Sequence, residues 1–140
     1  MPKFAVLVHA SKDSESGQMP TSQEFEEMDA FNKKYIDSGA LLHANGFLAS
    51  SKGARVLFSK DSAPTIKYGP FELENLVSGY WILKLDSMDE AIEFAQGVPF
   101  KDGSVEVRQV AGPEDFAEVL TEEQKREWEE RSQAEDKTPE

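Results

Sequence analysis

Apolar and polar residues follow patterns that predict four principal strands between residues 3 and 112. Each strand is a run of apolar or β-branched residues bounded by polar, glycine- or proline-containing segments. The expected strands cover residues 3–10, 40–48, 79–85 and 105–110.

Two helices are predicted between these strands. Residues 21–24 (TSQE) fit the S/T-x-x-E capping box, which marks a helix start. The apolar stripe that follows, at helical spacing, is Phe25, Met28, Phe31 and Tyr35. A second capping box at residues 87–90 (SMDE) opens a helix over residues 89–96, with Ile92 and Ala95 expected to face inward.

Two shorter strand candidates, residues 55–59 and 65–68, flank a polar turn and predict a hairpin between the second and third principal strands. The complete order is that of a ferredoxin-like α+β fold, βαββαβ with an inserted hairpin. In such a fold the helices cover one sheet face only. Because an uncovered apolar face is a liability, we expect a homodimer.

The C-terminal residues differ in composition from the rest of the chain. Residues 113–140 carry 11 acids and 4 bases, which is −7 of the net charge of −12. We therefore expect one domain over residues 1–112, a helical extension over residues 113–133 with a charged helix at 122–131, and a disordered tail over residues 134–140. The apolar residues expected to dock the extension on the domain are Phe116, Val119 and Leu120.

Composition excludes several classes of function. A net charge of −12 without a basic cluster argues against nucleic-acid binding. Cysteine is absent, which removes disulfides, thiol nucleophiles and thiolate metal sites. No run approaches the ~20 apolar residues that span a bilayer, and the N-terminus has no signal-peptide pattern, so we expect a cytoplasmic protein. No glycine-rich phosphate loop, G-x-S-x-G or H-E-x-x-H motif occurs, and we expect neither cofactor nor metal.

Strand alternation gathers polar residues on the sheet face opposite the apolar one. His9, Tyr80, Glu106 and Arg108 are expected to share that face. His9 ends a strand beside a polar loop, where it can transfer a proton near neutral pH, or simply be packed. Glu106 and Arg108 fit either a solvated ion pair or a ligand site. His43 lies on a weaker strand and is a lesser candidate.

The segment Gly69-Pro70-Phe71 predicts a rigid corner that presents an aromatic ring. Tyr68 precedes it and Glu72 follows. The alternative is a tight turn whose phenylalanine fills the core.

Residues 68–72 (YGPFE) and 76–82 (LVSGYWI) together resemble the DGPF-type branch of the YCII-related domain family. Supporting stretches are residues 39–42, 51–55, 87–92, 98–100, 105–110, 114–116 and 120–122. The resemblance implies a dimeric α+β barrel, in which two ferredoxin-like sheets pack face to face around a central cavity. Related barrels include muconolactone isomerase-like and dehalogenase-like proteins, small polyketide cyclases and oxygenases.

The chain departs from the family pattern at three places. Tyr68 stands where the signature has aspartate, and Asn45 replaces an acid. Residues 72–75 (ELEN) replace the usual E-x-K-E. If the family aspartate is a general base, this chain lacks it or uses Tyr68 differently.

Two hypotheses follow from the polar face and the resemblance. The first is a cofactor-independent enzyme of lyase, isomerase or cyclase type, which acts by acid/base chemistry on a small organic acid, lactone or polyketide-like aromatic. Its catalytic residues would be His9, Tyr68 and Glu72, and its substrate-binding residues Phe71, Tyr80, Glu106 and Arg108. His9 would be the proton shuttle and Arg108 the anion anchor. The second hypothesis is a non-catalytic dimeric protein that binds a metabolite or serves as an accessory.

Overall fold

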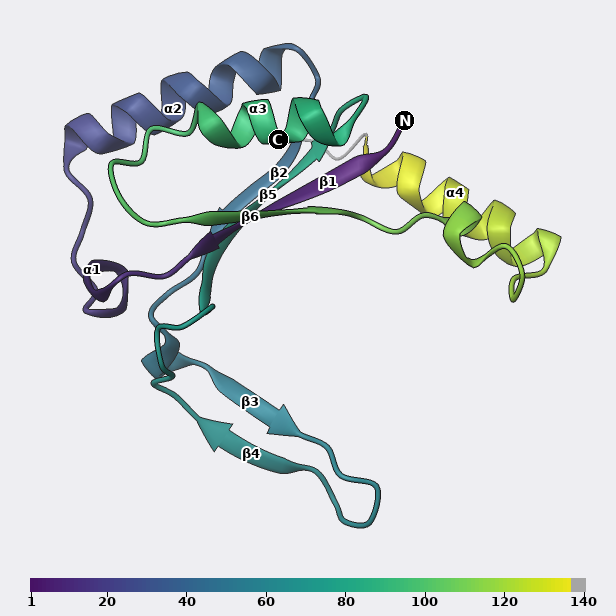
Figure 1. Cartoon of the computed structure of the whole chain (residues 1–140), viewed down its shortest axis with the longest axis horizontal. Helices are drawn as coiled ribbons and strands as arrows, with labels where there is room; N and C mark the ends of the chain where they lie inside the picture. The colour runs from purple at the N-terminus through teal and green to yellow at the C-terminus, as the bar shows by residue number, and fades with distance from the viewer. Residues whose placement is uncertain (137–140) are drawn as a thin grey trace.

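The computed structural model describes residues 1–136, and these form a four-stranded antiparallel sheet with two helices on one face (Figure 1). The strands are β1 (Lys3–His9), β2 (Leu41–Gly46), β5 (Val77–Lys84) and β6 (Val105–Gln109). Their order across the sheet is β2-β5-β1-β6, with antiparallel neighbours throughout. This order follows from two βαβ units placed around each other, so the ferredoxin-like α+β fold is confirmed.

The helices that cover the sheet are α2 (Ser22–Asp37) and α3 (Met88–Gln96) (Figure 1). Each begins at a predicted cap, since the Thr21 and Ser87 side chains accept hydrogen bonds from the third residue of their helices. The core between helices and sheet contains Val6, Trp81, Leu83, Phe94 and Val98. None of the helices within residues 1–136 is long and apolar enough to cross a membrane.

Two details of helix packing differ from expectation. In α3 the buried residues are Ala91 and Phe94, whereas Ile92 is exposed. Phe94 is buried in the core because its ring packs against the rings of Phe31 and Trp81. The spacing of residues within α3 does not reveal this aromatic cluster. In α2 the predicted stripe packs on the core except for Phe25, which lies in the first turn and is exposed.

The predicted hairpin is confirmed. Strands β3 (Ala54–Leu57) and β4 (Thr65–Tyr68) pair with each other in a separate two-stranded sheet. Figure 1 shows this hairpin projecting away from the four-stranded sheet. The 3₁₀ turn η1 (Ser50–Lys52) directly precedes the hairpin. The one-turn helix α1 (Lys12–Glu15), within a segment expected to be a loop, contacts η1 through a hydrogen bond between Glu15 and Ser50.

The C-terminal extension consists of the 3₁₀ turn η2 (Pro113–Phe116) and helix α4 (Glu122–Glu135). Its docking differs from expectation, since Val119 is exposed and Phe116 stacks on Trp128 within the extension, at 5.7 Å between ring centroids. The expected disorder from residue 134 is wrong for residues 134–136. The helix continues to Glu135, and Asp136 caps it while pairing with Lys3 and Lys84. Residues 137–140 lie outside the described residues.

Candidate functional site

The open face of the sheet, which lies opposite the helices, carries the polar residues that strand alternation assigned to it. Leu7 lies opposite Tyr80 on β5 and opposite Glu106 on β6, and Ala5 lies opposite Arg108. The neighbouring positions, such as Val6, belong to the core. Because side chains alternate between faces, His9, Tyr80, Glu106 and Arg108 share the open face.

His9 is held between two side chains at the end of β1. Its Nδ1 lies 2.7 Å from the Ser104 hydroxyl, and its Nε2 lies 3.6 Å from a Glu106 carboxylate oxygen. The His9 side chain is only 19% exposed. The backbone N–H of His9 also donates to the Ser104 carbonyl, so β1 and the start of β6 fix both partners. The imidazole therefore has one polar partner on each ring nitrogen, an arrangement that orients a proton-transferring histidine.

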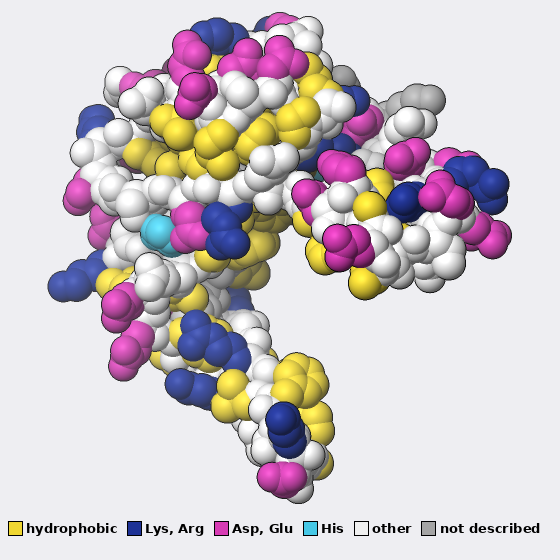
Figure 2. Space-filling view, turned by 45° about the vertical axis from the view of Figure 1, so that its right-hand side comes forward, with side chains coloured by type: hydrophobic (Ala, Val, Ile, Leu, Met, Phe, Trp, Pro, Cys, Tyr) yellow, Lys and Arg dark blue, Asp and Glu magenta, His cyan; other side chains and the backbone are white. Residues whose placement is uncertain are grey.

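Glu106 links His9 to Arg108. Arg108 Nη1 donates to the second Glu106 oxygen at 3.1 Å. The Arg108 side chain is 70% exposed, so much of its guanidinium is free to meet a ligand. Figure 2 shows a histidine, an acidic and a basic side chain adjacent on this part of the surface. Among the predicted site residues, His9, Glu106 and Arg108 form a row that is held together by direct contacts within residues 1–136.

Tyr80 lies further across the open face, toward edge strand β2. Its hydroxyl accepts a hydrogen bond from Asn45 Nδ2 at 3.0 Å, and its ring lies 5.7 Å from that of Phe47. Asn45 is one of the departures from the family pattern and now has a structural role. His43, on the same strand, lies opposite Ile82.

The hairpin carries the remaining predicted site residues away from His9. Tyr68 is 74% exposed on β4, and Glu72 is exposed just after the corner. The Phe71 ring lies beneath the Arg55 guanidinium, 3.9 Å from its centre. Tyr68 and Glu72, which the sequence groups with His9 as candidate catalytic residues, therefore do not contact His9 within residues 1–136, because the hairpin projects from the sheet (Figure 1).

The Gly69-Pro70-Phe71 corner packs on η1. A Cβ atom at Gly69 would collide with the backbone oxygen of Ser50, so only glycine fits there. The Phe71 N–H donates to the Ser50 hydroxyl at 2.9 Å, and the same hydroxyl donates to Glu15. Glu15 also accepts from the Ser50 N–H at 2.8 Å. The hydrogen bonds from the Ser50 hydroxyl and then from its N–H lower the pKa of Glu15 below its ordinary 4.5.

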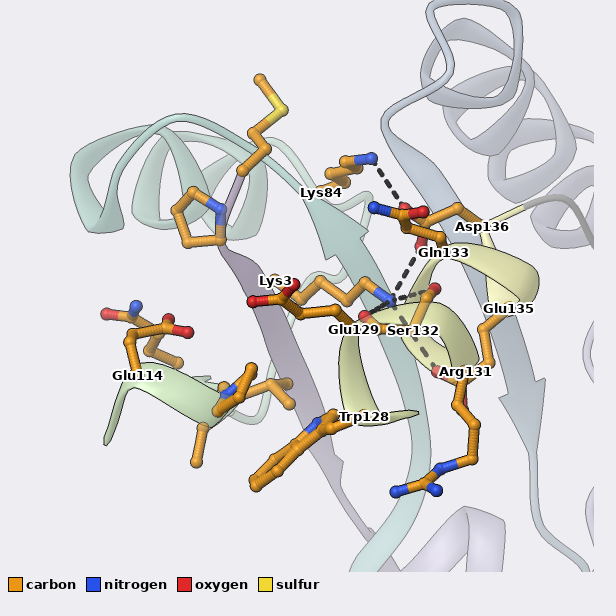
Figure 3. A pocket seen from close by; sticks show the side chains of 17 residues that line it. Lys3, Lys84, Glu114, Trp128, Glu129, Arg131, Ser132, Gln133, Glu135 and Asp136 are labelled. Atoms are coloured by element: carbon orange, nitrogen blue, oxygen red, sulfur yellow. Dashed lines mark hydrogen bonds and ion pairs between the residues drawn. The ribbon is translucent and has the colours of Figure 1, made fainter. Parts of the chain in front are cut away.

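A pocket of about 630 Å³ lies between the extension and the N-terminal end of β1 (Figure 3). Lys3 Nζ donates to the Ser132 hydroxyl at 2.7 Å and lies 2.8 Å from Asp136 Oδ1. Lys84 Nζ lies 2.6 Å from the other Asp136 oxygen. Burial raises the pKa of Asp136, but the hydrogen bonds from Lys3 and Lys84 outweigh burial and hold it below 3.8. The residues that line this pocket attach α4 to β1 and β5, and the lining does not include His9, Glu106 or Arg108.

Ser104, Asn45 and Ser50 are the polar partners that sequence reasoning missed. Each lies far in sequence from the residue that it contacts, so only the strand register or a turn contact reveals it. Within residues 1–136, no cluster of three His, Asp or Glu side chains could hold a metal ion.

Comparisons with known proteins place the chain in a family. The structure of a 5-chloro-2-hydroxyhydroquinone dehydrochlorinase from Burkholderia phenoliruptrix, in complex with 2,5-dihydroxybenzoquinone, is similar with a TM-score of 0.46 and 10% identity. The match covers 81% of this chain and 97% of that chain. No curated protein sequence matches this chain. The YCII-related domain, however, matches residues 3–114, which is most of the chain. The chain therefore belongs to the YCII-related domain family.

Proposed function

We propose that the protein is a cofactor-independent enzyme of lyase, isomerase or cyclase type that moves protons on a small organic acid, lactone or aromatic compound. The observation that carries this proposal is the fixed position of His9 between Ser104 and Glu106 on the open sheet face. A histidine that is mostly shielded, yet oriented through both ring nitrogens, is suited to general acid–base catalysis.

The partners of His9 define its two protonation states. In the neutral ring protonated at Nε2, Nδ1 accepts the Ser104 O–H, and Nε2–H points toward Glu106. When the ring gains a proton, Nδ1 donates to the Ser104 hydroxyl oxygen instead, and Nε2–H still points toward the Glu106 carboxylate. A substrate proton would reach Nδ1 through the Ser104 hydroxyl, whose oxygen takes up the substrate proton as its own proton passes to the ring, and the reverse relay returns it. Glu106 is the orienting carboxylate in this scheme.

Arg108 is the proposed anion anchor. Its guanidinium is the exposed end of the row and offers N–H groups beyond those that meet Glu106. A carboxylate or an ionised phenol bound there would lie beside Glu106 and within reach of His9. Tyr80, whose ring and hydroxyl face the same side, would supply a hydrogen bond and a stacking surface.

A homodimer would complete this site. The open face carries Leu7 and Ile82 beside the polar row, and helices α2 and α3 lie on the other side of the sheet (Figure 1). Within residues 1–136, the end of α4 meets the open face at Lys3 and Lys84, away from His9. Two sheets packed face to face would enclose a cavity between them. Tyr68, Phe71 and Glu72, at the base of the hairpin, would then complete the cavity wall from the partner protomer.

The second candidate is a non-catalytic dimeric protein that binds a metabolite or acts as an accessory. It is favoured by Tyr68, which stands where the family signature has a potential general base. Both candidates place the ligand in the same cavity. They differ in whether His9 changes the ligand or only contacts it.

A panel of hydroxylated benzoic acids, quinols and lactones tests the proposal, with thermal stabilisation and turnover as readouts. For a compound that is converted, His9→Ala should lower kcat by roughly tenfold to a thousandfold, the lower part of what general acid–base catalysis supplies. The control is Lys33→Ala, which removes an exposed titratable group of α2, on the other side of the sheet, and should leave turnover unchanged. Binding without turnover supports the second candidate, and equal losses in both variants contradict the role of His9.

A further inference from the structure

The β3–β4 hairpin has two chemically different faces. The register pairs Val56 with Ile66 and Ala54 with Tyr68, so these four apolar residues share one face. The other face carries Arg55 opposite Lys67. All residues of both strands are exposed. Phe58, just beyond β3, is also exposed.

Such a hairpin requires a partner surface. An isolated two-stranded sheet is at best marginally stable in water, and this one has no strand contact with the main sheet. Its apolar face is continuous from the base to the tip. Monomeric proteins seldom leave a face of this kind uncovered.

The distribution of charge along the chain indicates which surface the hairpin contacts. Residues 50–70 carry 4 bases and 1 acid, in a chain whose net charge is −12. Residues 113–136, which form the C-terminal extension, carry 10 acids and 3 bases. Figure 2 shows basic side chains along the hairpin and acidic side chains gathered on the extension. The two segments are complementary in charge.

The extension also has apolar side chains that the described chain leaves exposed. Val119 is 77% exposed, and Phe116 remains 45% exposed even though one side of its ring stacks on Trp128. Within one chain the hairpin and the extension lie on separate sides of the open sheet face and do not meet (Figure 1). Their contact therefore requires two chains.

We propose that the hairpin of each protomer docks by its apolar face on the C-terminal extension of a second copy of this chain. Phe58 and Val56 would pack near Val119, while Lys52, just before β3, and Lys60, in the turn of the hairpin, would meet the surrounding carboxylates. Because the arrangement is reciprocal, one dimer contains two such contacts. This inference rests on the homodimer of the proposed function and adds which segments hold it together.

Cysteine cross-linking tests the contact directly, because the natural chain has no cysteine. Phe58→Cys and Val119→Cys are prepared as separate proteins, mixed, and treated with a short bis-maleimide. The expected product is a covalent heterodimer of about twice 15.6 kDa. The control mixes Phe58→Cys with Met19→Cys, which is equally exposed but lies in the loop before α2. A yield no higher than in the control contradicts the docking.

A pair of neighbouring substitutions separates the two hairpin faces. Val56→Ser changes the apolar face and Leu57→Ser the cationic face, and both residues are 50% exposed in the single chain. Sedimentation should show that Val56→Ser raises the dimer dissociation constant about tenfold, as for a residue central to an interface, and that Leu57→Ser changes it by less than about threefold. Added salt should weaken the dimer of the unmodified protein.

The outcomes distinguish the two proposals. A dimer that forms equally well with Val56→Ser, and gives no specific cross-link, overturns the hairpin contact and leaves the sheet-to-sheet dimer standing. An unmodified protein that is monomeric at low micromolar concentration overturns both.

Discussion

The two faces of the four-stranded sheet are built from alternating residues of the same strands, yet they differ in burial and in charge. The helix-covered face contributes Phe4, Val6, Trp81 and Leu83, each nearly or fully buried. The open face presents a row of ionisable groups, His9, Glu106 and Arg108, connected by direct contacts. The difference shows that one alternating strand pattern places a buried apolar core on one side of the sheet and a row of ionisable side chains on the other.

The largest contrast between the faces should appear in stability. Leu83→Ala creates a cavity in the core and should lower the free energy of unfolding by about 2–5 kcal/mol. Ile82→Ala, at the adjacent position on the open face, should cost about 1 kcal/mol or less. Denaturant unfolding of both variants measures the difference. Equal losses would show that the open face is packed as tightly as the core.

The C-terminal extension sharpens the comparison because its anchors, Lys3 and Lys84, lie on the β1 and β5 strands. Deleting residues 113–140 removes a buried Pro113 along with the anchor, and should cost about 2 kcal/mol, or a few degrees in Tm. Composition alone suggests that deleting residues 134–140 has no effect. The Asp136 contacts instead predict a measurable, smaller loss. Calorimetry that finds both truncations equal to the full chain would contradict the anchor.

The next prediction concerns ligand binding on the open face, at Arg108. Arg108→Gln should weaken the binding of an anionic compound about tenfold, equivalent to about 1.4 kcal/mol, because a charge-assisted hydrogen bond is lost. Unfolding should change little, since the side chain is mostly exposed. Arg126→Gln on α4 is the control for the loss of one positive charge. Titration calorimetry that shows the same affinity in all three proteins would remove Arg108 from the site.

The smallest expected effect concerns pH. Because the folded pKa of Asp136 lies below 3.8, the folded state binds its proton less readily than the unfolded state. The stabilisation from this carboxylate is therefore fully present above about pH 5 and is lost as the pH falls through the folded pKa. Asp136→Asn should cost about 1 kcal/mol at pH 7 and nothing at the lowest pH at which the protein folds. A cost that does not depend on pH would mean that the contacts of Asp136 are not ionic.

Much of the fold was predictable because its signals are local. The capping residues Thr21 and Ser87 mark both helix starts, and strand alternation correctly separates Val6 and Trp81 from His9 and Tyr80. These signals depend only on the geometry of one helix or strand, and that geometry is visible in the sequence.

The partners within the candidate site were not predictable in the same way. Ser104 meets His9 across 95 positions of sequence, and Glu15 meets Ser50 across 35. Such pairs depend on how strands align and where turns pack, which no single segment encodes. The prediction of disorder from residue 134 missed the contacts of Asp136 for the same reason, since its partners Lys3 and Lys84 are distant in sequence.

The central claim, that the open face binds and transforms a small molecule beside His9, has one especially direct test. The chain has two histidines, so a spectrum selective for the imidazole Cε1–H group contains two signals, one from His9 and one from His43. Titration with a compound from the panel that stabilises the protein should move the His9 signal with saturation, and by more than the His43 signal, because His43 lies on the same face but opposite Ile82. Saturable binding that shifts only His43, or neither signal, would contradict the account.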